Sequence, residues 1–79
     1  MLVILSDEII ILNVVGERCP MPVHKTRKLL RNTPKDSIIH VIGDDPESVH
    51  DLPALISRLG LEPPIITRQQ NTWLFEIRN

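Results

Sequence analysis

The residue with the most evident chemistry is Cys19, the only cysteine in this chain of 79 residues. It lies in the segment Gly16-Glu17-Arg18-Cys19-Pro20-Met21-Pro22. A single thiol cannot close an intramolecular disulfide, and one cysteine in a small chain fits a reducing compartment better than a secreted disulfide scaffold. Because an apolar strand precedes the thiol and two prolines follow it, we expect Cys19 to be presented at the surface.

The position of Cys19, just before or at the first turn of a predicted helix, suggests a reactive thiol. The first N–H groups of a helix have no partner within it and stabilise a nearby anion by about 0.3–2 kcal/mol. Since about 1.36 kcal/mol corresponds to one pKa unit, the pKa of the thiol is expected to fall toward neutrality. Arg18, Lys25 and Lys28 would act in the same direction. We therefore predict a partly ionised nucleophile at pH 7.

Several kinds of thiol chemistry are compared for this site. Dithiol redox chemistry needs a second cysteine, and position 22 is proline. A cysteine hydrolase needs a base beside the thiol, and the spacing does not place any of the three histidines (His24, His40 and His50) there. These residues also lack the paired spacing of a zinc site, so we expect no metal. A buried structural cysteine remains the simplest alternative. A thiol that carries a sulfur atom between partners fits best, because this exchange needs one cysteine and a docking surface.

A basic helix is predicted directly after Cys19, from Pro20 or Pro22 to Asn32. At 100° per residue, four of its side chains fall within one arc of roughly 120°; they are Val23, Thr26, Leu29 and Leu30. The opposite face carries the candidate docking residues Lys25, Arg27, Lys28 and Arg31. A solvated helix exterior is the alternative interpretation of these charges.

The remaining elements follow from hydrophobic periodicity and turn residues. Strands are predicted at 9–15, 37–42, 65–69 and 72–78, the last two as an antiparallel hairpin, and a second helix from about Asp51 to Leu59. Asp51 is the expected N-cap of that helix, and Gly60 the glycine that ends it. The acidic residues Asp44, Asp45 and Glu47 lie just before this helix. A metal site formed by them with Asp51 is the alternative, but the spacing does not match a calcium loop, so they are assigned to turns and caps.

Every second residue of the last strand points to the same face of the sheet, and these residues are Trp73, Phe75 and Ile77. We expect this face to pack in the core. If the helices do not cover it, it would form an exposed patch for self-association.

The order βαβαββ predicts an α/β two-layer sandwich, a mixed four-stranded sheet with two helices on one face, in a single domain covering residues 1–79. The net charge of −1 and two aromatic residues argue against direct binding of nucleic acid. Asp7 and Glu8 interrupt the apolar N-terminal run, and no basic residue precedes it. We therefore expect neither a membrane-embedded segment nor a signal peptide, and a cytoplasmic location.

The motif resembles the signature of a known family. Gly16-x-x-Cys19-Pro20-x-Pro22, followed by a basic amphipathic helix, is similar to the Cys-Pro-x-Pro motif of the TusA/SirA/YedF-like sulfur carriers. The second half of the chain matches the same family at Asp44-Asp45-Pro46, Asp51-Leu52-Pro53 and Gly60. The resemblance covers about residues 9–78.

We expect Gly16, Arg18, Pro20 and Pro22 to present Cys19, and we expect no cofactor. The resemblance implies that Cys19 carries a persulfide. It implies a cysteine desulfurase or another sulfur donor protein as one partner and a sulfur acceptor protein as the other. One branch of the family serves thiolation of the tRNA wobble uridine, but Met21 replaces the acidic residue that is frequent there. Two alternatives stay open: a sulfurtransferase acting directly on thiosulfate-like donors, and a non-catalytic interaction module in which Cys19 is incidental.

Overall fold

The computed structural model describes residues 9–79, and it has the predicted element order. The expectations for residues 1–8 lie outside the described residues. The elements are β1 (Ile9–Asn13), α1 (Met21–Arg31), β2 (Ile38–Gly43), α2 (Ser48–Arg58), β3 (Ile65–Arg68) and β4 (Trp73–Arg78). The prediction of βαβαββ is therefore confirmed, with element ends that differ by at most three residues.

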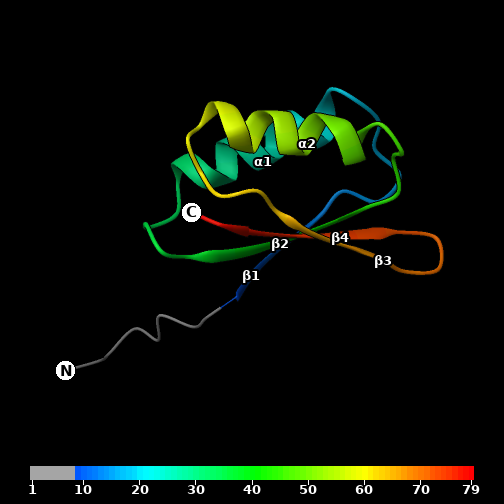
Figure 1. Ribbon diagram of the computed structural model, residues 1–79. Helices are drawn as coiled ribbons and strands as arrows, with labels where there is room; N and C mark the ends of the chain where they lie inside the picture. Colours follow the sequence, from blue (N-terminus) through cyan, green and yellow to red (C-terminus); the bar gives the residue numbers. More distant parts are fainter. Residues whose placement is uncertain (1–8) are drawn as a thin grey trace.

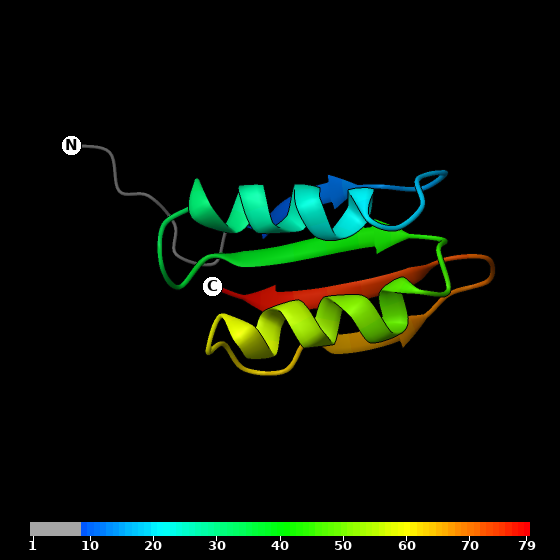
Figure 2. The ribbon, with the colours of Figure 1, turned by 90° about the horizontal axis from the view of Figure 1, so that it is seen from above.

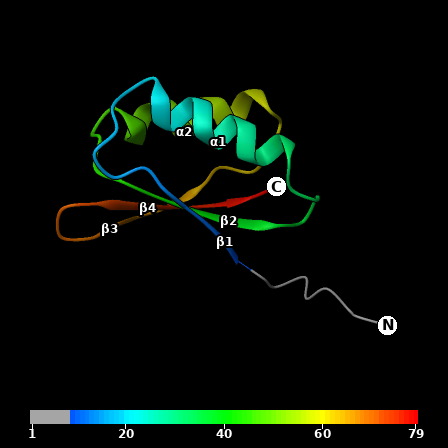
Figure 3. The ribbon, with the colours of Figure 1, turned by 180° about the vertical axis from the view of Figure 1, so that it is seen from behind.

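The four strands form one mixed sheet in the order β1-β2-β4-β3. β1 pairs with β2 in parallel, while β4 pairs antiparallel with both β2 and β3, so the predicted hairpin is confirmed. Both helices lie on the same face of the sheet (Figures 1 and 3). Seen from above, α1 covers the β1–β2 side and α2 covers the β4–β3 side (Figure 2). The two-layer architecture is thus the one that the sequence predicts.

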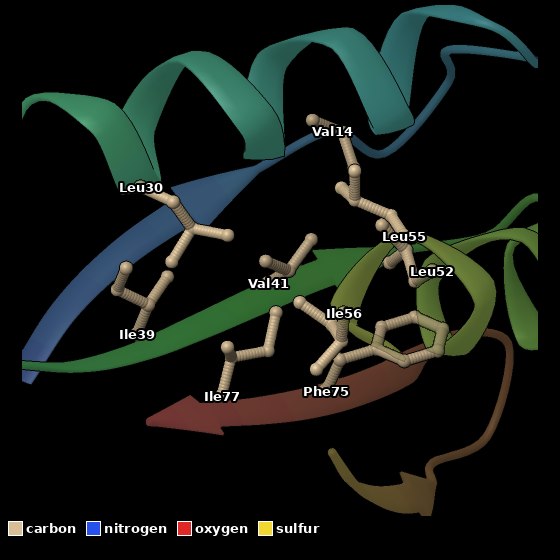
Figure 4. Close-up of a cluster of buried hydrophobic side chains, with 9 residues drawn as sticks. All are labelled: Val14, Leu30, Ile39, Val41, Leu52, Leu55, Ile56, Phe75 and Ile77. Carbon is tan, nitrogen blue, oxygen red and sulfur yellow. The ribbon is translucent and has the colours of Figure 1, made fainter. Parts of the chain in front are cut away.

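The core fills the space between the helices and the sheet (Figure 4). Its buried hydrophobic residues are Val14, Leu30, Ile39, Val41, Leu52, Leu55, Ile56, Phe75 and Ile77. Trp73 packs against this cluster, so the predicted face of β4 is the helix-covered one and the alternative of an exposed patch there is wrong. The opposite face keeps large apolar side chains in solvent, with Ile11 65% and Ile65 63% exposed.

The start of α2 differs from the prediction, whereas its end agrees with it. Asp51 is not the N-cap, because α2 begins three residues earlier, at Ser48. The backbone turns into the helix through bonds from the Ser48 N–H to the Asp45 carbonyl (3.0 Å) and from the Val49 N–H to the Pro46 carbonyl (3.2 Å). This places Asp51 in the first turn of α2, where its carboxylate is free for another contact.

Gly60 ends α2 as predicted. Its φ of +75° lies in the left-handed region that glycine adopts without steric cost. The Gly60 N–H donates to the Ser57 carbonyl and the Leu61 N–H donates to the Ile56 carbonyl, at 3.0 and 3.1 Å. This pair of bonds is a Schellman motif, which satisfies carbonyls of the last helical turn.

The parallel pairing of β1 and β2 brings two connections together at one edge of the sheet. The carboxyl ends of parallel strands meet at the same edge, so the β1–α1 and β2–α2 connections lie at the same end of the molecule (Figure 2). Within residues 9–79, neither helix has the length and apolar composition needed to cross a membrane.

Candidate functional site

Cys19 lies in the connection between β1 and α1, here called the cysteine loop (residues 14–20). The loop begins as an extension of the sheet, since the Val14 N–H donates to the Ile42 carbonyl at 2.8 Å. It then turns through a bond from the Glu17 N–H to the Val14 carbonyl at 3.1 Å. Gly16 has a φ of +87° in this turn, a conformation that residues with a Cβ rarely adopt. The glycine thus reverses the chain so that Cys19 can approach the β2–α2 connection.

Asp44 fixes the first half of the cysteine loop. Its Oδ1 accepts hydrogen bonds from the Gly16 N–H at 2.9 Å and from Arg18 Nη1 at 3.0 Å. The pKa of Asp44 lies below its ordinary value. The main cause is the hydrogen bond from the Gly16 N–H, and the second is the hydrogen bond from the Arg18 side chain. Because the folded-state pKa is depressed, this contact stabilises the fold above the carboxyl's unfolded pKa. That stabilisation is lost as the pH falls through the folded-state pKa.

Asp45 fixes the backbone at the cysteine itself. Its Oδ2 accepts the Cys19 N–H at 2.8 Å, and its Oδ1 accepts the Glu47 N–H at 3.1 Å. Asp45 is only 3% exposed, so neither bond is in strong competition with solvent. A buried N–H group without an acceptor costs about 1–3 kcal/mol. One carboxylate therefore holds the cysteine loop and the start of α2 in a fixed relation.

The thiol is exposed, as predicted, and lies beside Asp51. The Cys19 S–H donates to Asp51 Oδ2, with 3.1 Å between sulfur and oxygen. The hydrogen bond to Asp51 is the largest cause of a raised pKa for the Cys19 thiol, followed by desolvation and by the negative charges of Asp51, Asp45 and Glu47. The expectation of a lowered pKa is therefore wrong. The raised folded-state pKa means that this contact stabilises the fold below the thiol's unfolded pKa and loses that effect as the pH rises through the folded-state pKa.

The start of α1 explains why the helix does not favour a thiolate. Pro20 is the N-cap and Pro22 lies in the first turn, and neither has an N–H group. The Met21 N–H is used as well, because it donates to the Arg18 carbonyl at 2.9 Å. The two prolines thus reduce the number of N–H donors at the start of α1 that could stabilise the anion.

Arg18 and Lys25, two of the cations expected to support a thiolate, are engaged with other carboxylates. Arg18 pairs with Asp44, and Lys25 pairs with Glu17 at 2.7 Å. A cation that already faces a carboxylate contributes less positive potential to a third group. The predicted electrostatic support for a thiolate from Arg18 and Lys25 is therefore offset by their acidic partners.

A groove of about 250 Å³ between the two helices opens beside the thiol, here called the cysteine groove. It is lined by Cys19, Pro20, Val23, Arg27, Asp51, Ala54, Leu55 and Arg58. The thiol and Asp51 lie at the end where both helices start, and Arg27 and Arg58 come later along each helix. No histidine lines this groove, and His40 instead pairs with Glu76 on the sheet at 3.2 Å.

The predicted docking residues gather on the outer face of α1. They line a basic depression of about 750 Å³ together with Met21, His24 and Asn32. Arg27 belongs to both the basic depression and the cysteine groove. Lys25, Lys28 and Arg31 line the basic depression but not the cysteine groove. Of the four predicted docking residues, Arg27 is therefore the one that the structure brings to the groove that contains the thiol.

Comparison with known proteins identifies the family of this chain. The profile of the family described as "Sulfurtransferase TusA" matches residues 10–79, which is nearly all of the described chain. The chain belongs to the TusA sulfurtransferase family. A protein named sulfur carrier protein TusA, from Pseudomonas syringae pathovar tomato, is 31% identical over 68 residues, covering 86% of this chain and 81% of the relative. A protein named putative sulfur carrier protein, from Archaeoglobus fulgidus, is 38% identical over 48 residues, covering 61% of this chain and 62% of the relative, less than two thirds of its length.

Four residues of this site in this TusA family member are not recognised as site residues from their sequence pattern. The sequence predicts turns and a cap for Asp44, Asp45 and Asp51, and it gives no signal for Arg58. The signal was available in the strand order: a parallel pair places the residues after β2 beside those after β1. The acidic segment that follows β2 therefore had to meet the cysteine loop.

The raised pKa gives a direct prediction for the reactivity of Cys19. We expect its alkylation by iodoacetamide to be slow at pH 7 and to rise with pH, with a midpoint above that of a peptide spanning residues 16–22. The peptide is the matched control because it keeps the local sequence and lacks Asp45 and Asp51. Rates measured by mass spectrometry across pH 6–11 test this expectation, and a midpoint at or below that of the peptide contradicts it.

Proposed function

We propose that this protein is a sulfur carrier that holds a persulfide on Cys19 and transfers sulfur between partner proteins. The observation that carries the proposal is an exposed thiol on a loop whose backbone is fixed by two buried or half-buried carboxylates. Such a thiol is open to a partner and is held in one position. Membership of the TusA family and relatives named as sulfur carriers support the same role.

The chemistry is exchange without net oxidation. Sγ of Cys19 attacks the outer sulfur of a donor persulfide, a new sulfur–sulfur bond forms, and the donor's sulfur–sulfur bond breaks. The donor leaves as a thiol, and Cys19 carries the extra sulfur. An acceptor thiol then repeats the exchange on the carrier. A chain of 79 residues suffices, because the step requires a presented thiol and not an enclosed substrate pocket.

The proposed donor is a cysteine desulfurase or another protein that bears a persulfide, and the acceptor is a further protein of a sulfur relay. A relay toward 2-thiouridine in tRNA is one proposed destination, and the cytoplasm is the proposed location of the carrier. The acceptor would handle the nucleic acid, since the net charge of −1 gives this chain little attraction for phosphates.

The basic depression on α1 is the proposed docking surface. Its lysine and arginine side chains are exposed and lie along one helix that starts two residues after Cys19. An acidic surface on the donor would be attracted to this face and oriented with its persulfide toward the thiol.

Replacement of the thiol tests the carrier role. We expect the wild-type protein, incubated with a cysteine desulfurase and cysteine, to gain about 32 Da, the mass of one sulfur atom. The gain should be reversed by reductant and absent from Cys19→Ser. Intact-mass spectrometry measures both, and circular dichroism checks that the variant keeps its fold. Wild-type protein that gains no sulfur from the desulfurase, thiosulfate or polysulfide contradicts the proposal and favours an interaction module.

Charge removal on α1 tests the docking surface. We expect Lys28→Gln combined with Arg31→Gln to raise the apparent KM for loading by about tenfold, equal to about 1.4 kcal/mol, with little change in the maximal rate. The matched control is Arg78→Gln, an exposed arginine on β4, which is not part of the helix layer. The proposal requires the α1 variant to bind the sulfur donor more weakly and the Arg78→Gln variant to bind it as the wild type does. Equal KM values in both variants and the wild type would contradict it.

A further inference from the structure

The hydrogen bond between Cys19 and Asp51 raises a question that the carrier role leaves open. Sulfur exchange needs a thiolate nucleophile, but the surroundings of Sγ favour the protonated thiol. The proton must therefore leave Sγ as the new sulfur–sulfur bond forms. Among the residues that the structure describes, the side-chain partner of Sγ is Asp51, at 3.1 Å. This distance lies within the range of about 2.6–3.2 Å expected between a general base and the atom that it deprotonates.

We propose that Asp51 is a second catalytic residue, which takes the proton of Cys19 when sulfur is loaded and returns a proton to Sγ when sulfur is delivered. This inference rests on the carrier role proposed above and assigns the proton transfer within the same site. Asp51 can exchange a proton with Cys19 because the first turn of α2 holds its carboxylate beside Sγ. It is half-buried, and the cysteine groove leaves the space next to it open to a partner.

The loading step balances in atoms and electrons. The Cys19 S–H proton moves to Oδ2 of Asp51 as Sγ attacks the outer sulfur of a donor R–S–S–H. The donor's sulfur–sulfur bond breaks, and R–S⁻ leaves with the bonding electron pair. The proton on Asp51 then passes to R–S⁻, which becomes R–SH. The sum is Cys19–SH plus R–S–SH giving Cys19–S–SH plus R–SH, with no external oxidant or reductant.

The delivery step is the reverse with a different thiol. The acceptor thiol, R′–SH, gives its proton to the Asp51 carboxylate as its sulfur attacks the outer sulfur on Cys19. Sγ leaves with the bonding pair of the carrier's sulfur–sulfur bond and receives the proton from Asp51. Because the surroundings of Sγ disfavour a thiolate, a proton donor at 3.1 Å makes Sγ a better leaving group.

The charges around Sγ fit this assignment. From the β2–α2 connection, Asp45 and Glu47 add negative potential, and Asp51 adds more from α2 itself. On the cysteine loop, Arg18 is paired with Asp44, and Arg27 and Arg58 lie later along the helices of the groove. A free thiolate is thus disfavoured, while a proton shared between Sγ and a carboxylate leaves the total charge of the site unchanged. The free carrier is thereby kept protonated and protected from small electrophiles.

The test combines two rates on Asp51→Asn, whose amide has the same shape but cannot take up the proton. We expect alkylation of Cys19 by iodoacetamide at pH 7 to become faster, because the negative charge that disfavours the thiolate is gone. We expect the maximal rate of sulfur loading from a desulfurase and cysteine to fall by about 100-fold, the lower end of the effect of a general base. A more reactive thiol with slower sulfur transfer is the signature of the proposed role.

The matched control is Glu47→Gln. Glu47 is an exposed carboxylate that adds negative potential at Sγ, and its side chain makes no hydrogen bond to the thiol. We expect its loading rate to stay within about twofold of the wild type. The pH profile gives a second readout: the ratio of wild-type to Asp51→Asn loading rates should narrow as the pH rises, because hydroxide then supplies the thiolate that Asp51 otherwise generates.

The outcomes separate the two proposals. Wild-type protein that loads sulfur, with Asp51→Asn loading at the same or a higher rate, overturns the role of Asp51 and leaves the carrier role intact. Wild-type protein that loads no sulfur from any donor overturns both. A loss of loading in Asp51→Asn accompanied by an equal loss of alkylation also overturns the role, since it indicates a displaced thiol.

Discussion

The hydrogen bond from the Cys19 N–H to Asp45 is the contact on which the arrangement of the site depends. Asp45 follows β2, and Cys19 precedes α1, so a bond of 2.8 Å between them joins the two βα connections. The same carboxylate accepts the Glu47 N–H just before α2 begins. The position of Asp51 in the first turn of α2 then follows, and with it the contact to the thiol. The site thus obtains a fixed geometry from one nearly buried carboxylate.

The charge of the site differs from the usual picture of an activated cysteine. Cysteine nucleophiles are often activated by cations or by the N-terminus of a helix. Here the two prolines reduce the number of N–H donors at the start of α1, and the charges that shift the pKa of the thiol are carboxylates. After delivery, and before it is loaded again, the carrier exposes a free thiol that small electrophiles can attack. A thiol that ionises only during exchange with a partner suits that task better than one that is always ionised.

The sequence predicts the frame of this protein well and the surroundings of the thiol poorly. The β-branched run of β1, the apolar face of α1 and the glycine after α2 are local signals, and each specifies its element without help from distant residues. The contacts to Asp45 and Asp51 join residues 26 and 32 positions apart, and their geometry depends on the parallel pairing of β1 and β2. Periodicity therefore locates the cysteine, but only the assembled sheet determines which charges face it.

The most direct test of this account is hydrogen exchange at the Cys19 amide, measured by NMR in the wild type and in Asp45→Ala. The account predicts a protected amide in the wild type, because Asp45 accepts its proton at 2.8 Å in a nearly buried position. In Asp45→Ala the Cys19 amide should exchange at least tenfold faster, an effect of about 1.4 kcal/mol, while amides in β2 and β4 keep their protection. Equal exchange at Cys19 in the two proteins would contradict the central role of this contact.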